Sequence, residues 1–212
     1  HRVLNAGILC GQERRRAANL LNTDQKNEYI VGCGAIKAIL REFYGVNLFE
    51  QSFVKSSNGK VQPVKGNIHI CYSRTKNYCV LAVSDNEEVG VDCENCSSNY
   101  ESLEYIDHLV LIKVYLEKNI NTKLKISEKL FMSWTIFESL IKLRGWTIAE
   151  FFESNGVEWL KHQLSEESPV LFGSKIADNY LVFSWVRQKN VADMSHQPVI
   201  HSYGIDGLKK FC

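Results

Sequence analysis

The sequence predicts an α+β fold, because segments with helix periodicity and segments with strand periodicity occur in separate blocks along the chain. A helical block comes first and is followed by short strand-like runs, and the second half repeats the order of helices and then strands. The 212 residues are 45% hydrophobic and 23% charged, which is typical of a globular protein. This length suffices for one large domain or two small ones.

The first block contains two predicted helices. Residues 13–20, which include three consecutive arginines, are expected to form a short helix. A longer helix is predicted over residues 24–44, with Asp24 as its cap and Gly45 at its end. Its apolar residues recur at helical spacing. They are Tyr29, Ile30, Cys33, Ile36, Ile39, Leu40 and Phe43.

Strands are predicted next, near residues 52–55, 67–72, 78–84 and 88–94. The last two are expected to form a hairpin, because a polar turn at residues 84–87 separates them. The chain then becomes polar around residues 96–100, so we expect a lobe boundary there. The predicted domains are an N-terminal α+β lobe over residues 1–96 and a C-terminal α+β lobe over residues 97–212.

The second half is predicted to contain three helical regions and two strands. The helices are expected over residues 101–118, 127–145 and 147–163, with Ser127 as an N-cap. The strands are expected over residues 170–172 and 180–186. No clear pattern is present beyond residue 190.

The helix over residues 127–145 is apolar on nearly all sides, so we expect it to be buried. Its apolar residues are Leu130, Phe131, Trp134, Phe137, Leu140 and Ile141. Glu138 and Lys142 nevertheless lie one turn apart on one side of this helix. Because a charge buried alone is costly, each needs a partner, a metal or an anionic ligand. A salt bridge within the helix is the simpler alternative.

Two further carboxylates lie on the strand over residues 88–94. Asp92 and Glu94 are two residues apart, so their side chains point to the same side of the strand. Such carboxylates repel each other unless a hard cation such as Mg²⁺ lies between them. Glu138 is the candidate third oxygen ligand, and two solvated charges are the alternative.

Together these segments resemble the 4′-phosphopantetheinyl transferase superfamily. Residues 90–94 read Gly-Val-Asp-Cys-Glu, and residues 134–145 read Trp-Thr-Ile-Phe-Glu-Ser-Leu-Ile-Lys-Leu-Arg-Gly. Two weaker matches lie upstream: residues 58–61 are similar to the family's Gly-Lys-Pro segment, and residues 67–73 take the place of its Asn-Leu-Ser-His-Ser strand. The resemblance covers residues 12–187 and is closer to the two-lobed members of the surfactin-synthetase-activating type.

The resemblance implies two similar α+β lobes related by a pseudo-twofold axis, with the active site in the cleft between them. It implies transfer of 4′-phosphopantetheine from coenzyme A, the substrate, to a serine of an acyl or peptidyl carrier protein. Mg²⁺ is the implied cofactor, with Mn²⁺ as an alternative cation.

The site residues are also implied by the resemblance. The implied metal ligands are Asp92, Glu94 and Glu138, and the implied catalytic residues are Glu138, Lys142 and Asp92. The implied contacts with coenzyme A come from Lys60, Tyr72, Ser73 and Lys142.

The chain departs from the family pattern at two places. Cys71-Tyr72 replaces Ser-His, and a tyrosine hydroxyl can donate a hydrogen bond but carries no positive charge at neutral pH. Phe137 replaces a lysine. Each lost charge-assisted contact would weaken coenzyme A binding by about 1.5–3 kcal/mol. Two alternatives therefore stay open: a diverged homologue that uses another phosphate ligand, and a non-catalytic module that binds coenzyme A or a carrier protein.

Composition argues against other classes of protein. The net charge is +1 with no long basic tract, so nucleic acid is not an expected partner. No apolar run approaches the roughly 18 residues that span a membrane, and no secretory signal is visible. We expect a cytoplasmic monomer.

The cysteines are also expected to be those of a cytoplasmic protein. The seven cysteines are odd in number and show no disulfide framework, which favours reduced thiols. A zinc or redox site at Cys93 and Cys96, completed by His69 and Cys71, is a minor alternative.

Overall fold

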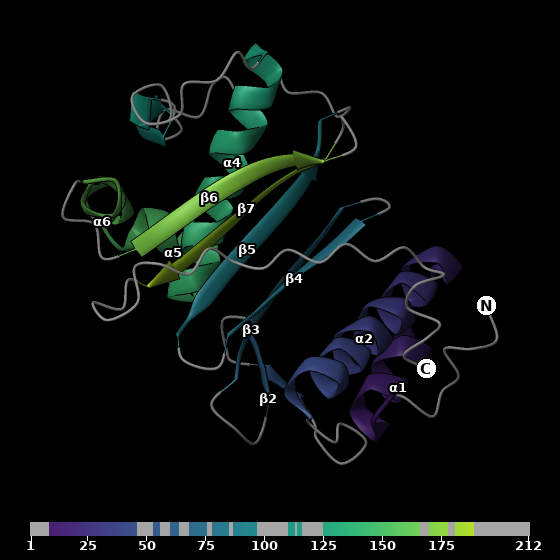
Figure 1. Ribbon diagram of the computed structural model, residues 1–212. Helices are drawn as coiled ribbons and strands as arrows, with labels where there is room; N and C mark the ends of the chain where they lie inside the picture. The colour runs from purple at the N-terminus through teal and green to yellow at the C-terminus, as the bar shows by residue number, and fades with distance from the viewer. Residues whose placement is uncertain are drawn as a thin grey trace. The chain divides into compact units, whose positions relative to one another are not determined.

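The computed structural model contains both helices and strands (Figure 1), which confirms the α+β class. It describes residues 9–45, 53–55, 60–63, 68–75, 78–84, 87–96, 110–112, 114–115, 125–165, 170–177 and 181–188. The chain divides into two compact units, of which unit 1 comprises His1–Val54, Pro63–Gly66 and Ser195–Cys212, and unit 2 comprises Lys55–Gln62 and Asn67–Met194. The lobes predicted over residues 1–96 and 97–212 stay a prediction.

Unit 1 contains helices α1 (Gly11–Asn19) and α2 (Thr23–Tyr44). A buried ion pair joins them, because the Lys37 Nζ lies 2.5 Å from the Glu13 Oε2. The predicted cap of α2 was wrong: the Asn22 side chain, not that of Asp24, accepts the first backbone N–H groups. The predicted end is confirmed, because Gly45 has a φ of 61° in the left-handed region.

The strand predicted over residues 67–72 is β3 (His69–Thr75), and it pairs antiparallel with β4 (Tyr78–Ser84). Two shorter strands precede them, β1 (Phe53–Lys55) and β2 (Val61–Pro63). The hairpin predicted between β4 and the next strand, β5 (Val89–Asn95), is not formed. β5 pairs instead with β7 (Leu181–Gln188), a strand from the far end of the sequence.

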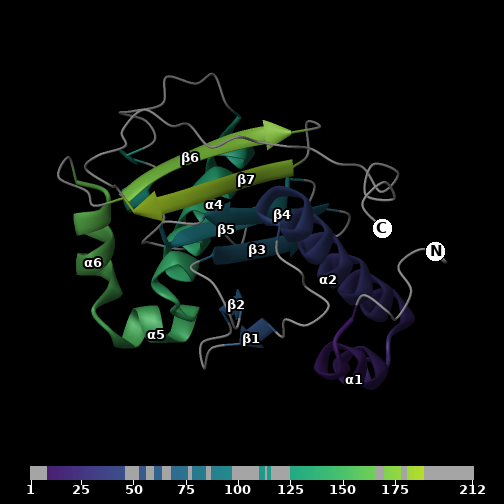
Figure 2. The ribbon, with the colours of Figure 1, turned by 60° about the horizontal axis from the view of Figure 1, so that its bottom comes forward.

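The larger sheet of unit 2 has the strand order β5-β7-β6, where β6 comprises Val170–Ala177, and all of its pairs are antiparallel. Helix α4 (Ile126–Arg144) lies against β5 and β7, as Figure 2 shows. The predicted N-cap of α4 was wrong, because the helix begins at Ile126 and Ser127 lies inside its first turn. Its predicted end at Gly145 is confirmed.

The segment 147–163 was predicted as a single helix, but it forms two, α5 (Ile148–Glu153) and α6 (Gly156–Gln163). Asn155 between them has a positive φ of 51°, a conformation that ends a helix. In the region 101–118, the described residues 110–112 and 114–115 are helical. The strand predicted over 170–172 extends further, to Ala177.

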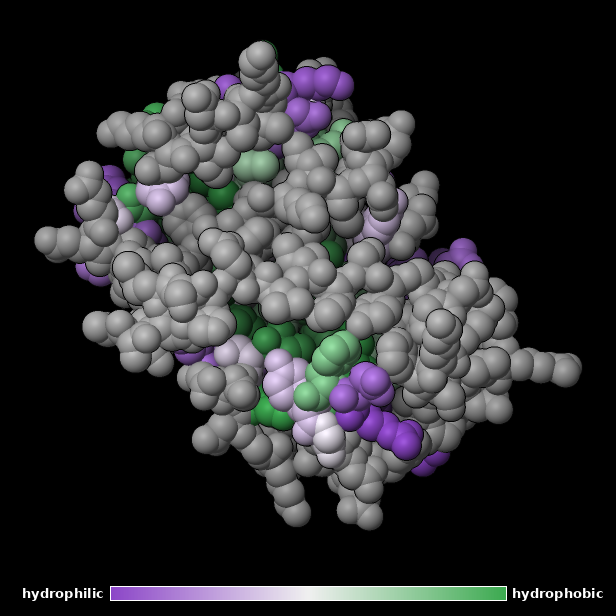
Figure 3. Space-filling model, in the orientation of Figure 1, coloured by the Kyte–Doolittle hydropathy of each residue, from purple (hydrophilic) through white to green (hydrophobic). Residues whose placement is uncertain are grey.

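The core of unit 2 lies between α4, the sheet and the two short helices. Its buried side chains are those of Ile112, Phe131, Met132, Ile136, Phe137, Leu140, Ile141, Leu143, Phe151, Leu160 and Val186. In Figure 3 some of the hydrophobic described residues are visible as green atoms. None of the described helices is both long and apolar enough to cross a membrane.

Candidate functional site

The candidate site lies where β5 approaches α4, and Gly90 permits this approach. A Cβ atom on Gly90 would lie 2.0 Å from the Ser139 carbonyl oxygen and 2.9 Å from the Leu143 backbone nitrogen. No side chain fits in that space, so the two backbones come close together. Asp92, two residues along β5, is thereby brought beside the last turns of α4.

Buried hydroxyl groups hold α4 against the sheet. The Thr135 Oγ1 and Ser184 Oγ atoms share a hydrogen bond of 2.6 Å. The Ser139 hydroxyl lies 3.0 Å from the Ser184 carbonyl oxygen and 2.7 Å from the Thr135 carbonyl oxygen. Because Ser184 is the register partner of Asp92, these bonds tie the helix to the part of the sheet that carries the carboxylate.

Asp92, Lys142 and Ser73 form a compact polar cluster. The Lys142 Nζ donates to the Asp92 Oδ1 at 2.5 Å and to the Ser73 Oγ at 3.0 Å. The Ser73 hydroxyl donates to the same Asp92 Oδ1 at 2.6 Å. The Asp92 side chain is 2% exposed, so its charge is compensated inside the protein rather than by water.

The second oxygen of Asp92 has a different environment. The Asp92 Oδ2 is buried and accepts no hydrogen bond from any residue that the structure describes. Buried carboxylate oxygens almost always have a partner. The free Oδ2 therefore marks a place where a ligand that attracts an anionic oxygen, such as a cation, would be stabilised.

Glu138 also lies beside the same ammonium group. Its Oε2 is 3.4 Å from the Lys142 Nζ, so the salt bridge expected within the helix is present. The shorter contact of Lys142, however, is to Asp92. Burial and the nearby charge of Asp92 raise the pKa of Glu138 to about 7, and Lys142 offsets part of this rise.

The pKa values of two other groups at the site are also shifted. Burial, followed by the charge of Asp92, raises the pKa of Glu94. Burial lowers the pKa of Lys142, but the charge and hydrogen bond of Asp92 outweigh this effect, so the pKa is raised. Lys142 is therefore a cation at neutral pH and cannot act as a general base.

The donor set fits a hard divalent cation. Mg²⁺ commonly takes one or two protein carboxylates and completes its shell with water and substrate phosphates. Asp92 offers a free buried oxygen, and Glu138 lies near the same ammonium group. Among the described residues, no three His, Cys, Asp or Glu side chains are grouped as metal ligands. Convergence of Asp92, Glu94 and Glu138 on one cation stays a prediction.

Lys60 has a structural partner that its sequence context did not indicate. Its Nζ donates to the Leu143 carbonyl oxygen at 3.3 Å, near the end of α4, and lies 3.4 Å from the Glu88 Oε2. A cation in this place satisfies the free carbonyl groups at a helix C-terminus. The predicted contact of Lys60 with coenzyme A stays a prediction.

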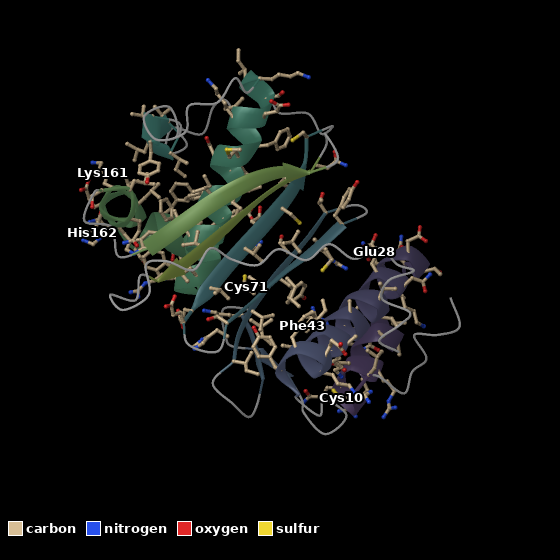
Figure 4. All side chains as sticks on the ribbon, viewed as in Figure 1. Cys10, Glu28, Phe43, Cys71, Lys161 and His162 are labelled. Atoms are coloured by element: carbon tan, nitrogen blue, oxygen red, sulfur yellow. The ribbon has the colours of Figure 1, made fainter. Side chains whose placement is uncertain are left out.

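Two neighbouring residues of β3, Tyr72 and Ser73, were both predicted to bind coenzyme A, but their side chains point to opposite faces of the strand. Successive strand residues point to opposite faces, and Ser73 points toward Asp92. Tyr72 therefore points the other way, and it is 37% exposed. Cys71, labelled in Figure 4, is on the Ser73 side, where its Sγ accepts a hydrogen bond of 3.2 Å from the Val91 nitrogen. Ser73 therefore lies on the face of β3 that meets Asp92 and Lys142.

Cys71 and Cys93 show features of buried apolar side chains. Cys93 is buried on β5, and burial, with the neighbouring charge of Asp92, raises the pKa of its thiol to about 12. Burial also raises the pKa of Cys71. Such thiols are protonated at neutral pH, whereas zinc ligands and redox cysteines act as thiolates.

Sequence reasoning missed the hydroxyl groups of Thr135, Ser139 and Ser184 and the role of Gly90. The one available signal was a glycine inside a strand pattern, which indicates a close backbone approach.

In comparisons with known proteins, no family model matches the chain and no curated protein shows significant similarity to it.

Proposed function

We propose that this protein is a Mg²⁺-dependent transferase that moves 4′-phosphopantetheine from coenzyme A to a serine of an acyl or peptidyl carrier protein. The observation that carries the proposal is the different environment of the two Asp92 carboxylate oxygens. One oxygen is held by Lys142 and Ser73, the other is buried with no hydrogen-bond partner among the described residues, and Glu138 lies next to the same lysine. This arrangement is suited to a cation that binds together with a phosphate group.

In the proposed site Asp92 and Glu138 hold Mg²⁺, with Glu94 as a further ligand. The metal, when bound, supplies positive charge to the diphosphate of coenzyme A. Lys142 keeps its proton and binds a phosphate oxygen. Its side chain is 31% exposed, so the ammonium group can reach a ligand from solvent.

The remaining task is to activate the serine of the carrier protein. The serine oxygen forms a bond to the phosphorus attached to the pantetheine arm, and the bond to the bridging oxygen breaks, which releases adenosine 3′,5′-bisphosphate. The serine proton needs an acceptor. Glu138, beside the Lys142 ammonium group, is the proposed acceptor of this proton, directly or through water.

The proposal extends to the fold and setting of the protein. It includes two similar α+β lobes with the reaction in the cleft between them, a monomer as the active species and a cytoplasmic location. Coenzyme A and the carrier protein are the proposed partners.

The direct test is a mass measurement. The full chain is incubated with coenzyme A, Mg²⁺ and an apo-carrier protein, and the carrier is weighed for the addition of one phosphopantetheine group. We expect wild type to load the carrier and Asp92→Asn to fail, because the amide cannot serve as an anionic ligand. Glu158→Gln is the control, since that glutamate is exposed on α6. Absence of loading by wild type, with several apo-carriers tried, would contradict the proposal.

One observation favours a second candidate, a diverged homologue that uses another phosphate ligand. Tyr72 points away from Ser73, and Lys60 contacts the end of α4. Tyr72 thus faces the other side of β3 from Ser73, and Lys60 bonds to Leu143 and Glu88 of the protein itself. Calorimetric titration of coenzyme A into wild type and Tyr72→His, with Mg²⁺ present, separates the candidates. The transferase should keep or gain affinity in the variant, because an imidazolium adds charge, whereas the diverged homologue should show no binding in either protein.

A further inference from the structure

The Asp92 Oδ1 accepts hydrogen bonds from two side chains that differ in conformational freedom. Ser73 has a short side chain on β3 and is itself buried. Lys142 has a long flexible stem, and almost a third of its side chain is exposed. Both groups donate to the same oxygen, and Lys142 also donates to Ser73.

The bonds of these two donors to Asp92 should respond differently when a phosphate ligand binds. An ammonium group that turns toward a phosphate oxygen weakens its bond to Asp92. The Ser73 hydroxyl has no such freedom, because its single rotatable bond keeps it within the cluster. It would remain bonded to Oδ1 and keep the carboxylate oriented, with the buried Oδ2 left for a ligand, since no described residue donates to it.

We propose that Ser73 is a positioning residue that holds the Asp92 carboxylate in the orientation needed to bind a divalent cation, independently of Lys142. This inference rests on the proposed function only in that a divalent cation binds at Asp92. It assigns to Ser73 a role through Asp92 rather than a contact with coenzyme A. Hydrogen-bond partners of metal-binding carboxylates commonly have this effect.

The test measures binding of Mn²⁺ to the full chain by the loss of the electron paramagnetic resonance signal of the free ion. Mn²⁺ is titrated alone and again with inorganic pyrophosphate, and the protein-free titration is subtracted because pyrophosphate itself binds Mn²⁺. We expect Ser73→Ala to weaken Mn²⁺ binding by about 10-fold to 100-fold in the presence of pyrophosphate. Ser73→Thr should recover most of the affinity, because it keeps the hydroxyl group.

A matched control is Ser133→Ala on α4. Ser133 is also buried, but its hydroxyl donates to the Lys129 carbonyl oxygen of its own helix. This variant should bind Mn²⁺ like wild type. Thermal melting of both alanine variants shows whether a loss of affinity merely follows a loss of stability. If Ser73→Ala does not fold, Ser73→Cys replaces it, since a thiol is close in size but a weak donor.

The outcomes separate this inference from the proposed function. Equal Mn²⁺ affinity of wild type and Ser73→Ala would overturn the role of Ser73, whether or not the carrier protein is loaded. Reduced affinity in Ser73→Ala with recovery in Ser73→Thr would support it, even if no carrier is loaded and the transferase proposal fails. Absence of Mn²⁺ binding by wild type, with and without pyrophosphate, would overturn both.

Discussion

The ion pair between Lys142 and Asp92 should contribute to folding, and replacing Lys142 by methionine tests this. Methionine keeps much of the apolar stem, so the change removes mainly the charge. The partner that remains, Asp92, is 2% exposed and would be left with Glu138 as a neighbouring carboxylate. We therefore expect Lys142→Met to lower the free energy of unfolding.

The magnitude follows from burial. Removing one partner of a fully buried ion pair costs about 3–5 kcal/mol. The Lys142 side chain is 31% exposed, and water screens part of this interaction, so we expect a loss of about 1–3 kcal/mol.

Lys161 provides a matched control. Its Nζ lies 2.5 Å from the Glu158 Oε1, the same distance as in the Lys142 pair, but the two side chains are 52% and 60% exposed. Figure 4 shows Lys161 on α6, beside His162. Exposed pairs contribute about 0–1 kcal/mol, so Lys161→Met should change stability little.

Urea unfolding of the three proteins in the presence of a chelator measures these differences. A second series with Mn²⁺ in place of the chelator tests the link to the site. A cation beside Asp92 and Glu138 would replace the missing positive charge, so Mn²⁺ should raise the stability of Lys142→Met more than that of wild type. Equal losses in the Lys142 and Lys161 variants would refute the buried ion pair.

Two further perturbations test the packing and the electrostatics of the site. Gly90→Ala places a Cβ atom 2.0 Å from the Ser139 carbonyl oxygen, so it should destabilise the protein by about 1–3 kcal/mol or more in thermal or urea unfolding. Gly32→Ala on α2 is the control and should not destabilise the protein, because a Cβ atom there meets nothing within 4 Å. In the metal-free protein, Glu138 binds its proton more tightly in the folded state, so stability should fall as pH rises from about 4.5 to about 7. Glu138→Gln should flatten this slope, and an unchanged slope would mean that Glu138 is not buried beside Asp92.

Local sequence patterns were sufficient to predict several elements that carry the site. The helix predicted over residues 127–145 is α4, with small differences at its ends. The prediction succeeded because the apolar residues and the terminating Gly145 all lie within one continuous segment. The same holds for β5, and for the relation between Glu138 and Lys142, which follows from helix geometry alone. These features depend on interactions between near neighbours.

The tertiary structure decided which segments meet. The pattern of β4 and β5 suggested a hairpin, but β5 pairs with β7. The amphipathic pattern of residues 147–163 suggested one helix, but the chain turns at Asn155 and forms two. For β5, pairing with a strand distant in the sequence outweighs the local preference. The break at Asn155 is local, because its left-handed conformation ends a helix.

The sequence by itself determined the kinds of charge at the candidate site and their places on a strand and a helix. The tertiary structure decided how these charges are paired. Lys142 lies closer to Asp92 than to Glu138, its neighbour on α4, because Gly90 lets β5 approach the helix and burial leaves Asp92 without water. Ser73 completes the pairing from β3. Its hydroxyl and the Lys142 ammonium group both donate to Oδ1, whereas no described residue donates to Oδ2. Such a difference between two oxygens of one carboxylate depends on contacts between distant segments, which local sequence patterns do not record.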